Sequence, residues 1–378
     1  MSDQLHTASR LRAFRSCPRK EHYQYALGIR TPSSPAQEFG TAAHSALEAY
    51  FRAWKEQDEQ AADDDQRVAA AFDSIATVHD PVDAIRLRAL LAAYHVKYGN
   101  EDWEIIAVEE QFRFYLGRLE FGGKIDALIR ERSTGRALVL EHKTSTQDTS
   151  PGSLYWDRLA LDTQISLYLD GCEFGLDVPV VGCVYDVLKR PLHEPLQATP
   201  ADQVGYTIGK GCKSCGGSAK NGEIAQGRGH LIVNFGSVVE QPECGDCKGT
   251  GWRCDKEGIP QAPRPYAKTR LTDESLEEFE ERLTSEIATR HDDYLQRGTI
   301  VRLDSELPKM RAELIDTALA MEVLRERGLY PPNHDACTFG REACAFFGAC
   351  AGRASIDDPY LFPRGVAHPE LVQPTRVA

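Results

Sequence analysis

Residues 137–144, which read Ala-Leu-Val-Leu-Glu-His-Lys-Thr, decide the fold of this chain. The four leading apolar residues predict a buried β-strand. Because successive side chains point to opposite faces of a strand, Glu141 and Lys143 share one face. The preceding strand pattern, residues 121–129, carries a single acid, Asp126, among apolar neighbours. The sequence therefore predicts two acids and a lysine converging on one face of a sheet.

Such a constellation is suited to metal-assisted phosphodiester hydrolysis, which needs a neutralised phosphate, an activated water and a stabilised leaving oxygen. This hypothesis assigns Asp126, Glu141 and the backbone carbonyl of His142 as ligands of Mg²⁺ or Mn²⁺. It assigns Lys143 as the cation that orients water or stabilises negative charge. The alternative is a cross-strand ion pair on a solvated face. The apolar neighbours favour the catalytic hypothesis, since unpaired charge is costly in a buried strand.

Four segments in order resemble the PD-(D/E)XK nuclease superfamily, specifically its RecB-like branch. They are Gly-Thr-Ala-Ala-His-Ser-Ala-Leu-Glu at 40–48, Gly-Lys-Ile-Asp at 123–126, Glu-His-Lys at 141–143 and Gln-Ile-Ser-Leu-Tyr at 164–168. The resemblance implies that His44 joins the metal ligands. It also implies that Gln164 and Tyr168, which share a helix face, help to hold the DNA strand and the active site. Taken singly, His44 could be a core histidine and the other two ordinary helix residues.

The same resemblance implies an α/β fold, with a mixed central sheet flanked by helices, and we expect a zinc-binding insertion to interrupt it. Residues 196–262 are rich in glycine, cysteine and polar residues, and we interpret them as an inserted module. Residues 1–195 would then form the N-terminal part of the nuclease core, and residues 263–378 its C-terminal helices and tail. The hydrophobic patterns predict helices near 9–30, 40–56 (continuing to about 98), 153–171, 272–287 and 309–328, and strands near 104–116, 121–131, 136–143 and 178–188.

The insertion contains two C-x-x-C pairs, a pattern typical of tetrahedral zinc sites with four sulfur ligands. The predicted ligands are Cys212, Cys215, Cys244 and Cys247. Cys254 and His230 are substitute ligands that this pattern leaves open.

A second group of cysteines, Cys17, Cys337, Cys344 and Cys350, can supply four thiolates to a [4Fe-4S] cluster. Their order, one cysteine before the core and three after it, resembles the iron–sulfur clamp of AddB-type recombination nucleases and CRISPR-adaptation exonucleases. The resemblance implies a structural cluster that closes a very long loop. The spacing from Cys337 to Cys344 is wider than in those relatives, and a zinc site is the alternative.

Length, composition and charge indicate the kind of cellular compartment in which the protein works. The chain has 378 residues, eleven cysteines and a net charge of −13. It shows no signal-like apolar run near its start and no stretch of apolar residues that could span a bilayer, so we expect a cytoplasmic protein with no membrane partner. In a reducing compartment the cysteines are better explained as metal ligands than as disulfides. The acidic balance disfavours non-specific coating of DNA, although a local basic groove could still bind it.

These observations predict a metal-dependent deoxyribonuclease, an exonuclease on DNA ends or single strands that acts by two-metal hydrolysis in recombination, repair or phage DNA processing. No G-x-x-x-x-G-K-[ST] loop is present, so a helicase or recombination protein would be a separate partner. One rival is a non-catalytic DNA-end-binding or scaffold subunit of a recombination complex. Another is a zinc-dependent adaptor. The complete set His44, Asp126, Glu141 and Lys143 favours the nuclease.

Overall fold

The computed structural model describes residues 5–60, 65–200, 212–213, 231–234, 237–240, 245–246, 248, 252–259, 261, 270–339, 342–368 and 371. Contacts divide the chain into two compact units. One comprises Met1–His193 and Glu280–Ala378, and the other Glu194–Phe279. None of the helices in the described part of the chain combines the length and apolar character needed to cross a bilayer.

The first unit is built on a mixed sheet of five strands in the order β1-β2-β3-β4-β7. β1 and β2 pair antiparallel, as do β2 and β3, whereas β3 and β4 run parallel and β7 pairs antiparallel with β4. This arrangement confirms the predicted α/β class with a mixed sheet. The strands are β1 (Trp103–Leu116), β2 (Leu119–Glu131), β3 (Ala137–Ser145), β4 (Cys183–Lys189) and β7 (Leu295–Ile300).

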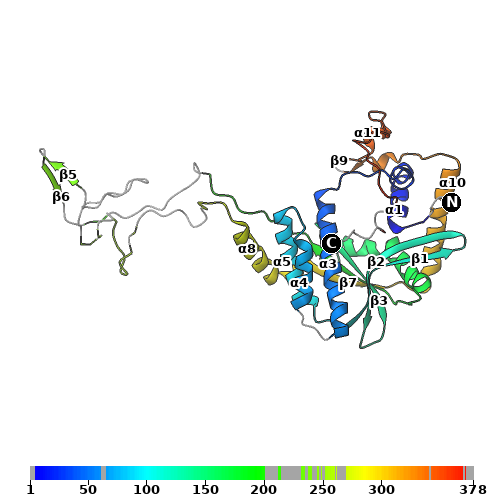
Figure 1. Cartoon of the computed structure of the whole chain (residues 1–378), viewed down its shortest axis with the longest axis horizontal. Coiled ribbons are helices and arrows are strands. Elements are labelled where there is room, and N and C mark those ends of the chain that lie inside the picture. Colours follow the sequence, from blue (N-terminus) through cyan, green and yellow to red (C-terminus); the bar gives the residue numbers. More distant parts are fainter. Residues whose placement is uncertain are drawn as a thin grey trace. The chain divides into compact units, whose positions relative to one another are not determined.

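Helices cover both faces of this sheet (Figure 1). Helix α3 (Pro35–Gln60) contacts β1, β2 and β3 and packs beside α4 (Asp65–Ile75) and α5 (Pro81–Tyr98). Helix α7 (Thr163–Asp170) contacts β2 and packs against α1 (Ala8–Ser16) and α10 (Leu307–Glu326). On β3, the His142 ring lies 5.2 Å from the Phe51 ring of α3, whereas neighbouring Glu141 bonds Gln164 of α7. Because adjacent side chains of a strand point to opposite faces, α3 and α7 cover opposite faces.

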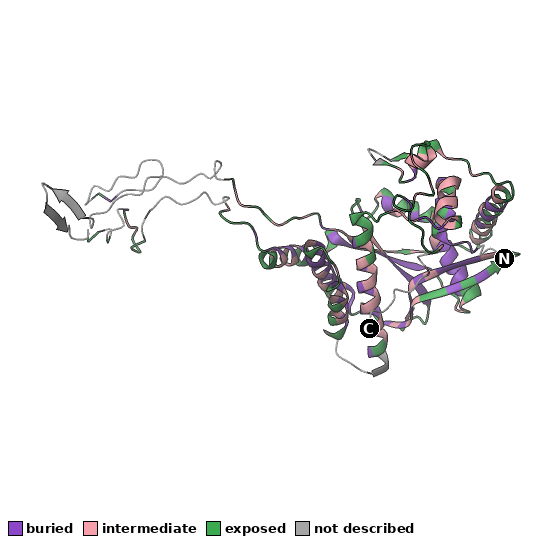
Figure 2. Ribbon diagram, turned by 45° about the horizontal axis from the view of Figure 1, so that its top comes forward, coloured by how far each residue is buried: buried purple, intermediate pink, exposed green. Residues whose placement is uncertain are grey.

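Buried residues follow the strands and the helix faces turned towards them (Figure 2). Val139 of β3 and Ile125 of β2 are fully buried, in one core cluster with Leu11 of α1 and Leu167 of α7. Helix α8 spans Leu276–Thr289. The remaining elements are short: α2 (Pro18–Glu21), η1 (His22–Ala26), α6 (Leu154–Asp157), η2 (Arg158–Leu161), η3 (Gly171–Gly175), β5 (Leu231–Asn234), β6 (Ser237–Glu240), α9 (His291–Tyr294), η5 (His334–Ala336), β8 (Thr338–Phe339), β9 (Glu342–Ala343) and α11 (Phe347–Cys350).

The helix expected near 9–30 is broken at Cys17. Thr7 caps α1 by accepting a hydrogen bond from Arg10 N, and the helix ends at Ser16. Cys17 is extended, with φ −164°, and Pro18 then begins α2. A proline disfavours helical backbone in the preceding residue and starts a helix well, which explains the break. The cysteine therefore lies at a corner of the chain.

Two strand expectations differ from the structure. The strand expected at 178–188 begins only at Cys183, because Pro179 and Gly182 interrupt the preceding segment. Strand β7, Leu-Gln-Arg-Gly-Thr-Ile, was not predicted, since it has no clear alternation of apolar and polar residues and contains Gly298. Pairing with β4 creates this edge strand.

Candidate active site

The site begins where the β2–β3 ladder stops. Their paired register runs from Arg130 and Ala137 to Ala127 and Leu140. One step further, the backbone N–H of His142 donates to the Asp126 side chain, with 2.7 Å from N to Oδ2. In a continued ladder this donor would meet a backbone carbonyl of β2. The Asp126 carboxylate therefore lies at the point where the two strands part.

Three potential ligands gather there. His44 Nδ1 of α3 lies 3.3 Å from Asp126 Oδ1. With Glu109 of β1 these side chains form a group whose ligand atoms all lie within 4.8 Å of one another. An imidazole nitrogen and carboxylate oxygens are donors that suit Mn²⁺, and the carboxylates suit Mg²⁺. The chemistry of the donor set therefore fits a divalent cation.

Sequence reasoning missed Glu109. It lies opposite Asp126 in the β1–β2 register, between the pairs Val108–Ala127 and Glu110–Ile125. Its φ of +54° is a left-handed conformation that costs a non-glycine residue on the order of 1–3 kcal/mol and is concentrated at functional sites. The only sequence signal was an acid inside a strand pattern, and a single sequence does not reveal register.

The neighbouring charges shift the pKa values of these three side chains in different directions. Burial and the Asp126 carboxylate raise the pKa of Glu109, against the opposing effect of its ion pair with Lys124. Desolvation of Asp126 favours its protonated form, but His44 and His142 outweigh it and hold its pKa well below the usual value. Desolvation would lower the pKa of His44, and the Asp126 charge instead raises it.

Glu141 and Lys143 lie beside this group and bond each other. Glu141 is 1 % exposed, and its Oε1 also accepts a hydrogen bond of 2.7 Å from Gln164 Nε2. Its Oε2 is buried without a hydrogen-bond partner. Burial and the Asp126 charge raise the pKa of Glu141 to about 7. A buried carboxylate oxygen with no donor is a group that a cation would satisfy.

Gln164 and Tyr168 meet this pair from α7. Asp162 caps the helix by accepting from Gln164 N, and Gln164 Nε2 also lies 2.7 Å from Tyr168 Oη. The Tyr168 ring packs edge-on against Phe112. The structure thus brings together all the side chains singled out by the four sequence motifs. Glu141 is not part of the group that His44, Glu109 and Asp126 form, and it connects to Gln164 and Lys143 instead.

The four cysteines predicted to bind iron and sulfur come from three segments that adjoin. Asn333 N lies 3.3 Å from Cys17 Sγ, and Cys337 Sγ lies 3.4 Å from Asn333 O. Cys344 N donates to Cys337 O at 2.8 Å. Desolvation and the nearby sulfurs of Cys17, Cys344 and Cys350 raise the pKa of Cys337. Among the described residues these four thiols form no disulfide.

The predicted zinc site falls mostly outside the described residues. Cys212 is described and buried, and Cys215, Cys244 and Cys247 lie outside the described residues, as does His230. Cys254 is described and partly buried.

Comparison with known proteins places the chain in a family. A family model for the PD-(D/E)XK nuclease superfamily matches residues 6–350. No curated protein matches the sequence. A solved structure titled "Crystal structure of SSO0001" is 17 % identical over 38 % of this chain and 58 % of that chain, with a TM-score of 0.19, which is too low to bear on the fold. Members of the superfamily are generally nucleases that use divalent metals. Because the family model covers most of its length, this chain belongs to the PD-(D/E)XK nuclease superfamily.

Proposed function

We propose that this protein is a metal-dependent DNA nuclease of the RecB-like branch, an exonuclease that acts on DNA ends or single strands. One observation carries the proposal: His44, Glu109 and Asp126 form a compact ligand group directly beside buried Glu141 and its partner Lys143. A scaffold has no evident use for three acids gathered at one largely buried point. The host process would be recombination, repair or phage DNA processing, with DNA as substrate and a separate helicase or recombination protein as partner.

Mg²⁺ or Mn²⁺ would be held by His44, Glu109, Asp126, Glu141 and the backbone carbonyl of His142, in a two-metal hydrolysis. Bound there, the metal supplies charge neutralisation at the phosphate and a lowered pKa for water. Lys143 contributes a fixed positive charge. Desolvation opposes that charge, but Glu141 and Asp126 raise the pKa of Lys143, so the amine stays protonated and can stabilise negative charge on the reacting phosphate.

Gln164 and Tyr168 position the carboxylate rather than react. Gln164 donates to Glu141 Oε1 and fixes its orientation, and the Tyr168 hydroxyl lies within hydrogen-bond distance of the same amide. Loss of either residue should weaken cleavage less than loss of Asp126 or Lys143.

Cys17, Cys337, Cys344 and Cys350 are proposed to bind a structural [4Fe-4S] cluster. The order of these cysteines, one before the nuclease core and three after it, supports a cluster over a single ion, and so does the approach of the Cys17 and Cys337 thiols to the backbone of Asn333. Iron and sulfide content of anaerobically purified protein, beside Cys344→Ser, tests the assignment. Protein that contains zinc and no iron would contradict it.

For the insertion 196–262 we propose a zinc module held by Cys212, Cys215, Cys244 and Cys247. The proposal rests on the paired C-x-x-C spacing. Zinc content measured for wild type and for Cys212→Ser and Cys254→Ser tests it. We expect loss of zinc in the first variant alone.

The decisive experiment digests end-labelled single- and double-stranded linear DNA and closed circular DNA, with Mn²⁺ or with EDTA, using wild type and Lys143→Ala. We expect metal-dependent loss of linear DNA by wild type and not by the variant. Cleavage of circular DNA would indicate an endonuclease. Binding of DNA ends without cleavage by wild type would instead support the non-catalytic scaffold.

A further inference from the structure

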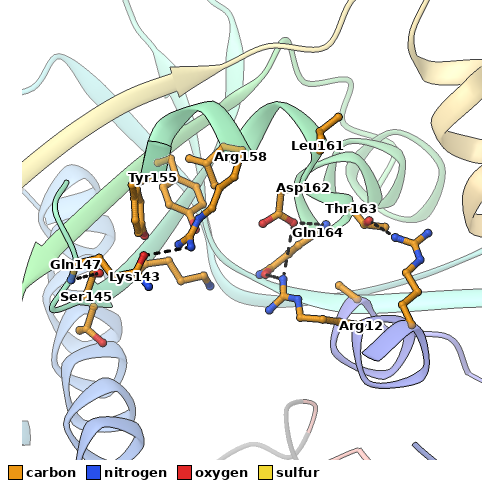
Figure 3. A pocket seen from close by; sticks show the side chains of 15 residues that line it. Arg12, Lys143, Ser145, Gln147, Tyr155, Arg158, Leu161, Asp162, Thr163 and Gln164 are labelled. Carbon is orange, nitrogen blue, oxygen red and sulfur yellow. Dashed lines mark hydrogen bonds and ion pairs between the residues drawn. The ribbon is translucent and has the colours of Figure 1, made fainter. Parts of the chain in front are cut away.

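A cavity of about 560 Å³ opens beside Lys143 (Figure 3). One wall is α1, which contributes Arg12 and Arg15, and the other is the segment of η2 and α7 that carries Arg158 and Gln164. The end of β3 forms the floor. The volume of this cavity lies in the range of sites that bind a small molecule or one unit of a polymer.

The cavity is strongly cationic in an acidic protein. Arg12, Arg15, Lys143 and Arg158 line it, and Asp162 is the one carboxylate among its lining residues. The whole chain carries a net charge of −13, so these cations form a local exception. A cluster of one sign within a concave surface focuses the field and attracts a ligand of the opposite charge.

Two of the arginines are positioned to take a ligand, and the third is not. Arg15 is committed to the fold, because its guanidinium lies 2.6 Å from Thr163 Oγ1 and 3.0 Å from Thr317 Oγ1. Arg12, whose side chain is 63 % exposed, makes longer contacts with the described residues, 3.3 Å to Gln164 Oε1 and 3.8 Å to Asp162. A guanidinium has five N–H donors, so most of those on Arg12 are available.

Arg158 is the counterpart on the opposite wall. Its guanidinium stacks over the Tyr155 ring at 4.3 Å, and Nη1 donates to Gln147 Oε1 at 3.2 Å. Stacking fixes the plane of the guanidinium and leaves its other edge exposed, which favours forked recognition of phosphate oxygens. The hydroxyls of Thr144 and Ser145 lie at the floor, and Leu161, 83 % exposed, offers apolar surface at the rim.

We propose that this cavity binds one nucleotide of a single DNA strand, next to the scissile phosphodiester on its Lys143 side, with Arg12 and Arg158 contacting an internal phosphate. The inference rests on the proposed nuclease function and specifies how the substrate lies. Single-stranded DNA is favoured because the cavity is enclosed by α1 on one side and η2 on the other and has room for one nucleotide rather than for a double helix. A smaller cavity of about 220 Å³ shares Thr144, Ser145 and Gln147 and continues towards Phe39, which provides space for the neighbouring nucleotide.

The test measures binding of a single-stranded oligonucleotide in EDTA by fluorescence anisotropy, for wild type, Arg12→Gln, Arg158→Gln and the double variant. Arg130→Gln is the matched control, since Arg130 is a half-exposed arginine paired with Glu104 and does not line the cavity. Each cavity variant should weaken binding by roughly tenfold and reduce the slope of log K against log salt by about 0.7. The control should change neither.

Replacing one phosphodiester at a time along the strand with a neutral methylphosphonate then locates the phosphate that the two arginines contact. In wild type, one internal position should weaken binding, and the penalty at that position should disappear in the double variant. A penalty that persists in the double variant, or variants that match Arg130→Gln, would overturn the proposal. So would an equal arginine effect on blunt duplex DNA, or an effect confined to a terminal phosphate.

The two proposals fail in different ways. Metal-dependent cleavage by wild type with binding indifferent to Arg12 and Arg158 refutes this site and leaves the nuclease intact. Arginine-dependent binding without cleavage under any metal refutes the nuclease and leaves a single-strand binding site. Thermal unfolding of each variant, expected within a few degrees of wild type because both side chains are exposed, excludes misfolding as the cause.

Discussion

Two clusters of charged, partly buried residues lie on the same sheet and differ in how completely their charges are paired. The active-site cluster consists of His44, Glu109, Asp126, Glu141 and Lys143. The edge cluster, Tyr94, Glu101, Asp186 and Arg297, joins β4 to β7. In the edge cluster Asp186 is fully buried, and Arg297 bonds both of its carboxylate oxygens. Tyr94 Oη also donates to Asp186 Oδ2 at 2.7 Å, and Glu101 lies 2.7 Å from Arg297 Nη1.

The difference in pairing distinguishes charged residues that stabilise the fold from charged residues that serve a function. The edge cluster pairs its buried acid fully, as buried ions require for a stable fold. The active-site cluster has three acids, leaves Glu141 Oε2 without a donor and holds Glu109 at a strained φ. Burial next to Asp126 also raises the pKa of Glu141 to about 7. Strain, an unpaired oxygen and a shifted pKa at one point are typical of a site that binds a cation or reacts.

Of the substitutions considered, Asp126→Asn in the active-site cluster should have the largest effect on the cleavage rate. The carboxylate is a proposed metal ligand, and loss of several kcal/mol of transition-state stabilisation corresponds to a fall in cleavage rate of roughly 10³-fold or more. Stability should fall modestly, because the charge that His44 and His142 stabilise is lost, whereas the asparagine oxygen can still accept the hydrogen bond from His142 N. Single-turnover cleavage with Mn²⁺ and chemical denaturation check the two expectations. Unimpaired cleavage by a folded variant would remove Asp126 from the chemistry.

Asp186→Asn should show the reverse pattern. It removes the buried carboxylate that Arg297 bonds twice and leaves Glu101 as the guanidinium's remaining acid among the described residues, so we expect a loss of about 3 kcal/mol of unfolding free energy, the lower end of the range for breaking a buried pair. Cleavage per folded molecule should stay near wild type. Urea unfolding and a cleavage assay at low temperature measure both. A stable variant that has lost activity would show that the edge cluster serves the reaction and that the contrast between the clusters is false.

Glu141→Gln tests the comparison through the pH dependence of the free energy of unfolding. The pKa of Glu141 is about 7 in the folded protein against an ordinary 4.5, so the folded state holds this proton more tightly than the unfolded state. Stability contributed by that proton is fully present below pH 4.5 and is lost as pH rises through 7, a loss of up to about 3 kcal/mol. In EDTA, the variant should therefore gain stability over wild type from pH 5 to pH 8. A difference that does not change with pH would contradict the raised pKa.

The parts of the site that are local in sequence could be predicted from it. The alternation around Glu141 and Lys143, the lone acid at Asp126 and the four-residue spacing of Gln164 and Tyr168 need only strand and helix geometry. Pro18 could also have indicated the helix break at Cys17, since the residue before a proline avoids helical backbone. These features depend on neighbours within a few positions of the chain.

The rest depends on contacts between distant segments. Glu109 matters because the β1–β2 register sets it opposite Asp126 and because its backbone turns left-handed there. In the sequence Asp186 is an isolated acid within a strand pattern, and its partner Arg297 is contributed by β7, a strand with no clear pattern of its own. The cationic cavity joins α1 to a segment about 150 residues later, a pairing seen in the contact of Arg12 with Gln164.

Tyr94→Phe tests whether the two clusters act independently and should have the smallest effect. Tyr94 Oη bonds Asp186 and also lies 3.5 Å from His142 Nε2, while His142 N bonds Asp126, so this hydroxyl makes a polar contact between the two clusters. The Phe ring keeps the packing against Tyr50 and Phe51. Loss of one hydrogen bond to a charged acceptor should cost about 1.5 kcal/mol of unfolding free energy, since Arg297 still pairs Asp186. Cleavage rate and Mn²⁺ dependence should match wild type, because the Asp126 carboxylate keeps its bond from the His142 backbone. A tenfold loss of cleavage with unchanged stability would mean that His142 transmits the orientation of Tyr94 to the metal ligand.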